Sequence, residues 1–201
     1  MPGLWGRSVK AAGVATILII VLGAGYYFSQ RQQSAAPQIE FDNLLETAMK
    51  ITSPAFATNQ SIPAKYTCDG DNINPPLEIS DVPEAAKSLV LIMDDPDIPD
   101  YVRQRLGATT FDHWLAYNIP ATTRQIAEGQ PIGIFGKNSS GNAAYTGPCP
   151  PDGQHRYFFK LYALDTLLDL PAGADKASLE KAMEDHMLGQ AQIIGLYSRA
   201  K

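Results

Sequence analysis

Two histidines and a short acidic run are the residues of this sequence whose types and spacing could do chemistry. His113 and His155 each lie at the start of an aromatic-rich segment, and Asp95 and Asp97 lie where an apolar segment ends. If the three segments are strands of one sheet, two imidazoles and one or two carboxylates meet at its edge. A third histidine, His186, falls within an apolar helical pattern, which is typical of a packing role.

Three interpretations of this group of side chains remain open. Both histidines could be structural, half-buried and hydrogen-bonded. Two imidazoles and a carboxylate could form a facial set of metal ligands, although no His-x-His or His-x₃-His spacing supports one. The group could also be an anion pocket, in which an imidazole and backbone N–H groups donate hydrogen bonds and an aspartate orients one imidazole.

A proline-rich loop leads into the segment that carries His155. Pro148, Pro150 and Pro151 each fix φ and remove a backbone donor, so this stretch is not expected to form a regular element. The segment 157–164 that follows is aromatic and apolar on both faces, which is typical of a buried strand. We therefore expect a rigid loop that presents His155 at the edge of a sheet.

Apolar runs predict the other elements that position these residues. A continuous apolar run at 88–93 predicts a central strand that ends at the acidic segment. A helix is expected at 176–188, with Asp175 as its N-cap. Further strands are predicted at 51–56, 77–80, 111–120 and 191–197, and loops at 101–110 and 121–145.

Composition favours a loop-rich β protein and excludes one class of partner. The chain has 201 residues, with 15 prolines and 16 glycines, more than a helical bundle would tolerate. Its net charge is -5, and residues 1–31 hold three bases and no acids, so the remaining 13 bases face 21 acids, a net of -8. Nucleic-acid binding relies on basic side chains, and we therefore expect no nucleic-acid partner.

The N-terminal region contains an uncharged apolar run at 11–28, preceded by Arg7 and Lys10. At ~1.5 Å per residue the run spans roughly 27 Å, close to the hydrocarbon thickness of a bilayer. The alternative is a cleaved signal peptide, with Ser34 and Ala36 at the cleavage site. The length of the run favours an uncleaved signal anchor.

The chain is accordingly expected to have three parts. Residues 1–31 would be a signal anchor or transmembrane segment, residues 32–49 a tether, and residues 50–201 the folded domain. Because the bases precede the apolar run, we expect a single-pass protein of the cell membrane with its domain on the extracytoplasmic side, in the periplasm or at the cell surface.

Several separated motifs resemble one family. The acidic run at 95–99, the His113-Trp114 pair and the stretch GPCPPDGQHRY at 147–157 are similar to the phosphatidylethanolamine-binding protein (PEBP) family, in particular to its bacterial, Raf-kinase-inhibitor-like (YbhB/YbcL-type) branch. The resemblance covers about residue 50 to the C-terminus. It implies a mainly β fold, in which a central antiparallel sheet packs on a second small sheet with a few peripheral helices.

The resemblance also implies a small cavity that accepts phosphate, acetate or a phospholipid head group. We expect no metal, because the histidine spacing does not support one, and no cofactor. By motif, the residues that bind the ligand would be Asp95, Asp97, His113, Pro150, His155 and Tyr157. The loop at 98–110 is longer than in the compact bacterial pattern, so the size of the ligand is not carried over. The kinase-inhibitor role of eukaryotic members is not carried over either, because it concerns cytoplasmic partners.

Cys68 and Cys149 are the two cysteines of the chain, and both lie in turn-rich segments that match the family. Outside the cytoplasm, an even pair favours a disulfide. The alternatives are two buried free thiols, or a catalytic Cys149 assisted by His155.

These observations together favour a membrane-tethered PEBP-like binding protein over an enzyme. Its partners would be a small anion or a phospholipid head group, and the membrane through the N-terminal helix. The first alternative is a hydrolase-type enzyme that uses Asp95, His113 and His155 for acid–base chemistry. The second is a protein-interaction or protease-inhibitor module that uses the long loops around Tyr101 and Asn138.

Overall fold

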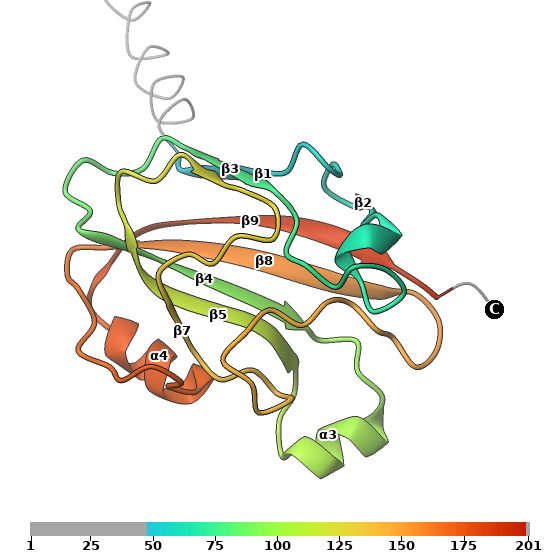
Figure 1. The fold of residues 1–201 in the computed structure, drawn as a ribbon. Coiled ribbons are helices and arrows are strands. Elements are labelled where there is room, and N and C mark those ends of the chain that lie inside the picture. The colour runs from blue at the N-terminus through green and yellow to red at the C-terminus, as the bar shows by residue number, and fades with distance from the viewer. Residues whose placement is uncertain (1–47, 200–201) are drawn as a thin grey trace, which may run out of the picture. The chain divides into compact units, whose positions relative to one another are not determined.

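The computed structural model describes residues 48–199. Its largest feature is a six-stranded sheet (Figure 1). In spatial order the strands are β2 (Gln60–Ser61), β9 (Met187–Tyr197), β8 (His155–Leu164), β4 (Ser88–Asp95), β5 (Phe111–Pro120) and β7 (Ile134–Phe135). All neighbours run antiparallel except β2 and β9, which are parallel.

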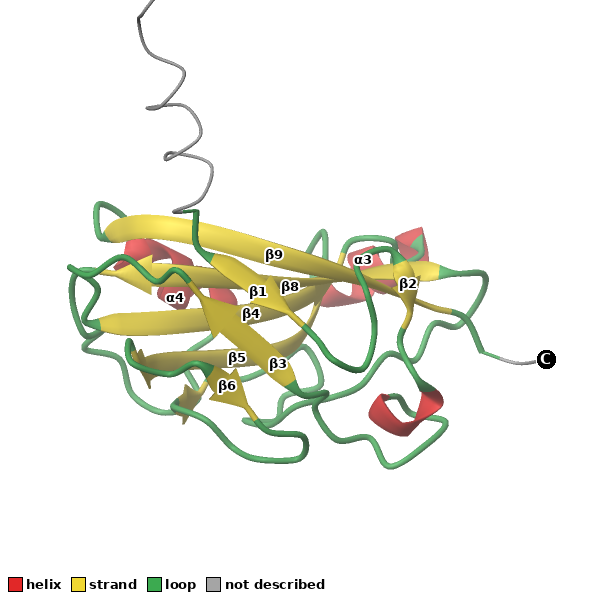
Figure 2. Ribbon diagram, turned by 90° about the horizontal axis from the view of Figure 1, so that it is seen from above, coloured by secondary structure: helices red, strands yellow, loops and turns green. Residues whose placement is uncertain are grey.

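A second sheet of three strands lies over one face of the large sheet (Figure 2). Its strands are β1 (Lys50–Thr52), β3 (Leu77–Ser80) and β6 (Gln125–Ile126), with β3 in the middle. Alternate residues of a strand point to the same face, and Leu77 and Ile79 of β3 are buried in one core with Leu89, Leu91 and Met93 of β4. The main hydrophobic core therefore lies between the two sheets.

The opposite face of the large sheet is covered in part by the helix α4 (Lys176–Met183) (Figure 1). Val90 and Ile92 of β4 form a second core with Leu179 and Met183 of this helix. Because β4 is buried on both faces, it reads as a continuous apolar run. The expected mainly β fold with two packed sheets is thus confirmed. Among residues 48–199 the helices are few and peripheral: α3 (Asp100–Leu106), α4 and the short 3₁₀ helix η1 (Ala64–Tyr66).

The central strands match their predicted bounds closely, and the C-terminal helix does not. Strands at 77–80 and 111–120 have the predicted ends. The predicted helix at 176–188 is wrong beyond Met183, because Glu184 leaves the helical conformation with ψ 136° and Asp185 has φ +64°. The last strand consequently begins at Met187.

This earlier helix end also corrects the role expected for His186. The residue lies outside α4, and its side chain is 44% exposed. Its Nδ1 lies 2.8 Å from the carboxylate of Asp165. His186 therefore does not pack on an apolar helix face.

The segment predicted as a loop at 101–110 contains a helix instead. α3 begins after Pro99, which fixes an extended φ and ψ at the N-cap position. It ends at Gly107, whose φ of +63° is the left-handed conformation that glycine adopts at helix C-termini. Seven residues are too short for an apolar period to reveal the helix in the sequence.

The expected membrane location needs a correction. Within residues 48–199, no helix combines the length and the apolar character required to cross a bilayer. The predicted anchor and tether, residues 1–49, lie almost entirely outside the described residues. The structure thus gives no support to a single-pass membrane protein, and that expectation is withdrawn. The domain boundary at residue 50 stays a prediction.

Candidate functional site

A cavity of about 320 Å³ opens at one edge of the large sheet. Three segments line it: the end of β4 with α3, the start of β5, and the loop before β8. Its walls are mostly apolar, with a few polar side chains. Of the six residues named by the family motifs, Asp95 and His113 belong to the lining.

The strand directions explain why these residues meet. β4 is antiparallel to both β5 and β8, so the end of β4 lies beside the starts of its two neighbours. Asp95 pairs with Phe111 at the start of β5. His113 follows two residues later, and His155 is the first residue of β8. The two imidazoles and the carboxylate therefore reach the same edge of the sheet, as the sequence predicted.

Asp95 is held by two hydrogen bonds. Its Oδ2 lies 2.7 Å from Nδ1 of His155, and both side chains are almost fully buried. Since a carboxylate accepts, Nδ1–H of His155 donates. Oδ1 of Asp95 accepts from the backbone N–H of Asp97 at 2.8 Å. His155 is thus placed behind Asp95, with its Nε2 3.5 Å from the exposed carboxylate of Asp152.

His113 is buried in the wall, and its ring orientation is fixed by one hydrogen bond. Nδ1 lies 2.7 Å from the carbonyl oxygen of Thr146, which can only accept, so Nδ1 carries the hydrogen. Burial lowers the pKa of His113, an effect that the Thr146 bond and the charge of Asp95 oppose in part. A neutral His113 therefore has an unprotonated Nε2. Its ring packs against Phe111 and Tyr157, with centroids 4.7 and 5.2 Å away.

Asp97 is occupied by an ion pair outside the cavity lining. Its carboxylate accepts from Nη2, Nε and the backbone N–H of Arg156 at 2.6, 2.8 and 2.9 Å. These hydrogen bonds lower the pKa of Asp97, and those from the guanidinium have the largest effect. The pair joins the end of β4 to the start of β8.

Pro150 and Tyr157 are both buried and lie behind the wall. The hydroxyl of Tyr157 has no hydrogen-bond partner among residues 48–199. Burial raises the pKa of Tyr157 well above its ordinary value, so the hydroxyl stays protonated. Four of the six predicted residues thus surround the lining rather than forming it: Asp97, Pro150, His155 and Tyr157.

The sequence interpretation missed the contribution of α3 to the cavity. Val102 and Arg105 line one side, and their spacing of three residues places them on one face of α3, while Ile98 lines the cavity from the segment just before the helix. Arg105 forms no ion pair with any residue that the structure describes. This spacing was present in the sequence, and it would have indicated the wall if the segment had been considered helical.

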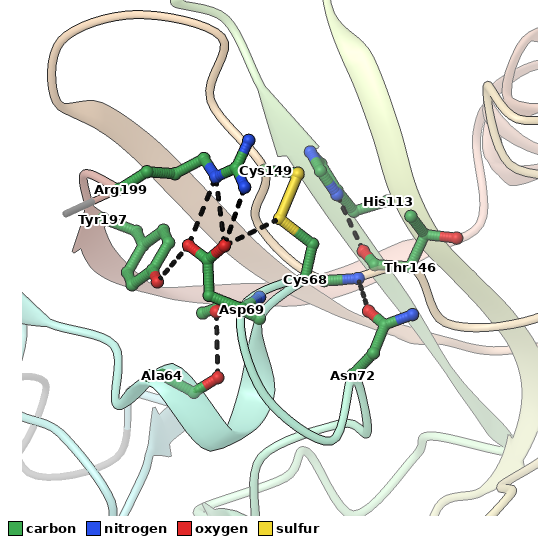
Figure 3. The surroundings of a disulfide bond; sticks show 11 residues. Ala64, Cys68, Asp69, Asn72, His113, Thr146, Cys149, Tyr197 and Arg199 are labelled. Carbon is green, nitrogen blue, oxygen red and sulfur yellow. Dashed lines mark hydrogen bonds and ion pairs between the residues drawn. A yellow bond between two sulfur atoms is a disulfide. The ribbon is translucent and has the colours of Figure 1, made fainter. Parts of the chain in front are cut away.

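The loop that completes the wall is fixed to its surroundings by a disulfide (Figure 3). Cys68 and Cys149 are bonded, with an S–S distance of 2.07 Å, which confirms the predicted bridge. Neither sulfur is a free thiol, so a catalytic Cys149 is excluded in this form of the protein. Cys149 lines the cavity while its partner lies in the loop after η1.

Hydrogen bonds hold the same two loops together beside the disulfide. The backbone N–H of Cys68 donates to Pro148 O at 3.1 Å, and that of Gly147 donates to Asn72 Oδ1 at 2.7 Å. A Cβ at position 147 would lie 2.6 Å from the carbonyl oxygen of Tyr66, so only glycine fits this approach. The wall is therefore rigid on the side of the loop.

Within residues 48–199, no three His, Cys, Asp or Glu side chains lie close enough together to hold a metal ion. The cavity is lined by hydrogen-bond acceptors on Asp95 and His113, the cation of Arg105, the hydroxyl-bearing side chains of Ser140, Thr146 and Tyr101, and apolar side chains. This set can bind a small molecule that has both a negative charge and a proton to donate.

Comparison with known proteins agrees with this architecture. A family model described as phosphatidylethanolamine-binding protein matches residues 52–198. The chain is 48% identical over 158 residues to a UPF0098 protein of Methanothermobacter thermautotrophicus, covering 75% of this chain and 99% of that protein. It is 46% identical over 153 residues to a UPF0098 protein of Chlamydia pneumoniae, covering 76% of this chain and 100% of the other.

Two solved structures share the fold. The crystal structure of a phosphatidylethanolamine-binding protein homolog from Chlamydia trachomatis superposes with a TM-score of 0.74 at 44% identity, covering 77% of this chain and 99% of that chain. Escherichia coli YbcL, described as a member of the mammalian PEBP family, superposes with a TM-score of 0.67 at 28% identity, covering 76% of this chain and 99% of that chain.

Proposed function

Because the chain belongs to the phosphatidylethanolamine-binding protein family, we propose that it is a binding protein whose cavity takes a small phosphate-bearing anion, either inorganic phosphate or a phospholipid head group. The observation that carries the proposal is the cavity of about 320 Å³ with a buried His113 and an unpaired Arg105 in its wall. The family resemblance already implies a ligand of this kind, and the residues of the lining support the choice of a phosphate-bearing anion.

The donors and acceptors of the wall favour a phosphate monoanion, which keeps a P–OH group to donate. Nε2 of a neutral His113 accepts, because Nδ1 is committed to Thr146, and the carboxylate of Asp95 accepts as well. A phosphate monoanion can donate through its P–OH to one of these acceptors. Its remaining oxygens can accept from the guanidinium of Arg105.

The six motif residues have two kinds of role in this proposal. Asp95 and His113 contact the ligand directly. His155 and Asp97 hold the end of β4 in place, since each is hydrogen-bonded across to the other strand. Pro150 and Tyr157 support the wall from behind.

The arrangement predicts that binding takes up a proton when the ligand is a monoester dianion, which has no P–OH group left to donate. A phosphate monoester loses its second proton near ~6. Above that pH, either the ligand or His113 must gain a proton for the two to hydrogen-bond. The pKa of His113 is lowered by burial, so the imidazole does not hold that proton in advance. Affinity should therefore rise as the pH falls from about 7.5 to about 5.5.

Isothermal titration calorimetry with phosphate and with phosphoethanolamine, at several pH values, tests the proposal. His113→Gln keeps an amide that can donate to Thr146 but removes Nε2, and it should weaken binding by about tenfold or more, the worth of one hydrogen bond to a charged group. Phosphoethanolamine that binds better than phosphate would identify the head group as the ligand. Equal binding by wild type and His113→Gln at every pH would contradict the proposal.

A further inference from the structure

One wall of the cavity is apolar, and the binding of an inorganic anion does not require an apolar wall. Ile98, Tyr101 and Val102 contribute apolar surface from the α3 segment, and Phe111 contributes more from β5. Ile98 and Val102 are only 5% and 7% exposed, so they anchor the segment to the protein. Tyr101 is 59% exposed, and its ring is available at the cavity.

The size of the cavity points the same way. Its volume of about 320 Å³ lies at the lower end of the roughly 300–1,000 Å³ typical of sites for small organic molecules. A phosphate group consists of a few heavy atoms and leaves most of this space to be filled by water against apolar walls. Burial of an alkyl group there would release that water and stabilise the complex.

The position of the charged groups leaves room for such a substituent. Arg105 lies on the same helix as Tyr101, one turn further along, and both line the cavity. Asp95, the last residue of β4, and His113, near the start of β5, line the same cavity. An anion held by Arg105 and His113 therefore has apolar side chains next to it rather than open solvent alone.

We propose that α3 makes this site selective for phosphate monoesters that carry a short aliphatic group, over inorganic phosphate. The inference rests on the proposed function, since it assumes that the cavity binds a phosphate. It goes further by naming the substituent and the element that recognises it. Tyr101, whose exposed ring lines the cavity, determines this selectivity.

A homologous series of monoesters tests the inference: inorganic phosphate, then methyl, ethyl, propyl and butyl phosphate, titrated calorimetrically into the full chain at one pH. Burial of one methylene group contributes about 0.8 kcal/mol, a factor of about four in affinity. Tyr101 lies at the open rim of the cavity, so each methylene group is only partly buried. We therefore expect the affinity of the wild-type protein to increase roughly threefold for each methylene group added. Tyr101→Ser, which removes an exposed ring, should flatten this dependence while leaving inorganic phosphate binding within about twofold.

The matched control is Leu167→Ser, which removes an apolar side chain that is 63% exposed and does not line the cavity. It should retain the wild-type dependence on chain length. Equal affinity for all four esters, with inorganic phosphate still bound, would overturn the inference and leave the proposed function intact. A dependence on chain length that survives in Tyr101→Ser would overturn the role of α3. Failure of wild type to bind any compound of the series would overturn the proposed function as well.

Discussion

Arg105 and His113 face the same cavity but differ in how their charge depends on pH. The guanidinium is always charged, whereas burial lowers the pKa of the imidazole. Arg105 also lacks an ion-pair partner within residues 48–199, so its charge is not neutralised by the part of the protein that the structure describes. The permanent attraction for an anion therefore comes from Arg105, and the pH dependence from His113 and the ligand.

Replacement of Arg105 should weaken phosphate binding at every pH. A hydrogen bond to a charged group is worth about 1.5–3 kcal/mol, and because Arg105 is exposed we expect the lower end, a loss of about tenfold for Arg105→Gln by calorimetry. Arg103→Gln is the control, since Arg103 is on the same helix and binds Pro96 O rather than lining the cavity. Equal losses in the two variants would show that α3 is merely perturbed.

The lowered pKa of His113 should also appear in the stability of the protein. The unfolded imidazole titrates near ~6.5 and the folded one lower, so between these values the unfolded state binds more protons. The free energy of unfolding must then fall as the pH falls through this window. In urea titrations, His113→Gln should lose less stability than wild type between about pH 7 and pH 5. An identical loss in both would mean that His113 does not titrate differently in the folded state.

At this scale the sequence predicted the convergence of Asp95, His113 and His155, because strand ends that share a sheet edge bring their side chains together. It could not separate the residues that line the cavity from those behind it. Asp97 is an example, because its carboxylate is bound by Arg156 of β8 and does not line the cavity. The pairing of β8 that brings Arg156 to this position is known only from the folded sheet.

The element with most influence on the character of the site is α3, and its end depends on one glycine. Gly107 has φ +63°, and a Cβ there would meet no atom within 4 Å, so conformation rather than space selects glycine. Gly107→Ala should destabilise the helix by roughly 1 kcal/mol, and amide exchange in Arg103–Leu106 should accelerate about fivefold. Gly107→Asn, which tolerates the left-handed conformation better, should accelerate exchange less. Equal exchange rates in wild type and Gly107→Ala would show that the C-cap is not critical.

The accuracy of the element predictions follows from burial. The strands β4 and β5 were predicted well because both of their faces are buried and their apolar runs are continuous. The end of α4 was missed because His186 and Met187 continue the helical spacing from Met183, while the break is made by the backbone of Asp185. No pattern of side chains marks such a change from helix to strand.

At the scale of the whole molecule, the disulfide joins two loops that are 81 residues apart in sequence. Closing a loop of that length should stabilise the fold by about 4 kcal/mol in the chain-entropy model. Reduced wild type, or the double variant Cys68→Ser/Cys149→Ser, should therefore unfold at lower guanidinium concentration than the oxidised protein. Ligand affinity should change little, because hydrogen bonds to Pro148 and Asn72 also fix the cavity wall. Equal stability of the oxidised and reduced forms would contradict the expected stabilisation by the disulfide. Loss of ligand binding on reduction would contradict the expectation that affinity changes little.

The fold as a whole was recognisable from separated motifs, whereas the ligand depends on the details of one cavity. The two sheets and the disulfide agree with the family resemblance. The cavity combines motif residues with α3, a segment in which the chain was already seen to differ from the compact bacterial pattern. Its ligand therefore has to be established on this protein itself.

The central claim is that a phosphate-bearing anion contacts His113, and imidazole NMR tests it most directly. The ring ¹⁵N resonances of the three histidines should be followed while phosphate or phosphoethanolamine is added. His186 serves as an internal reference, because it lies in the turn before β9 and does not line the cavity. We predict that Nε2 of His113 shifts strongly and saturably and that both nitrogens of His186 do not move. Saturating ligand that leaves the His113 resonances unchanged would contradict the account.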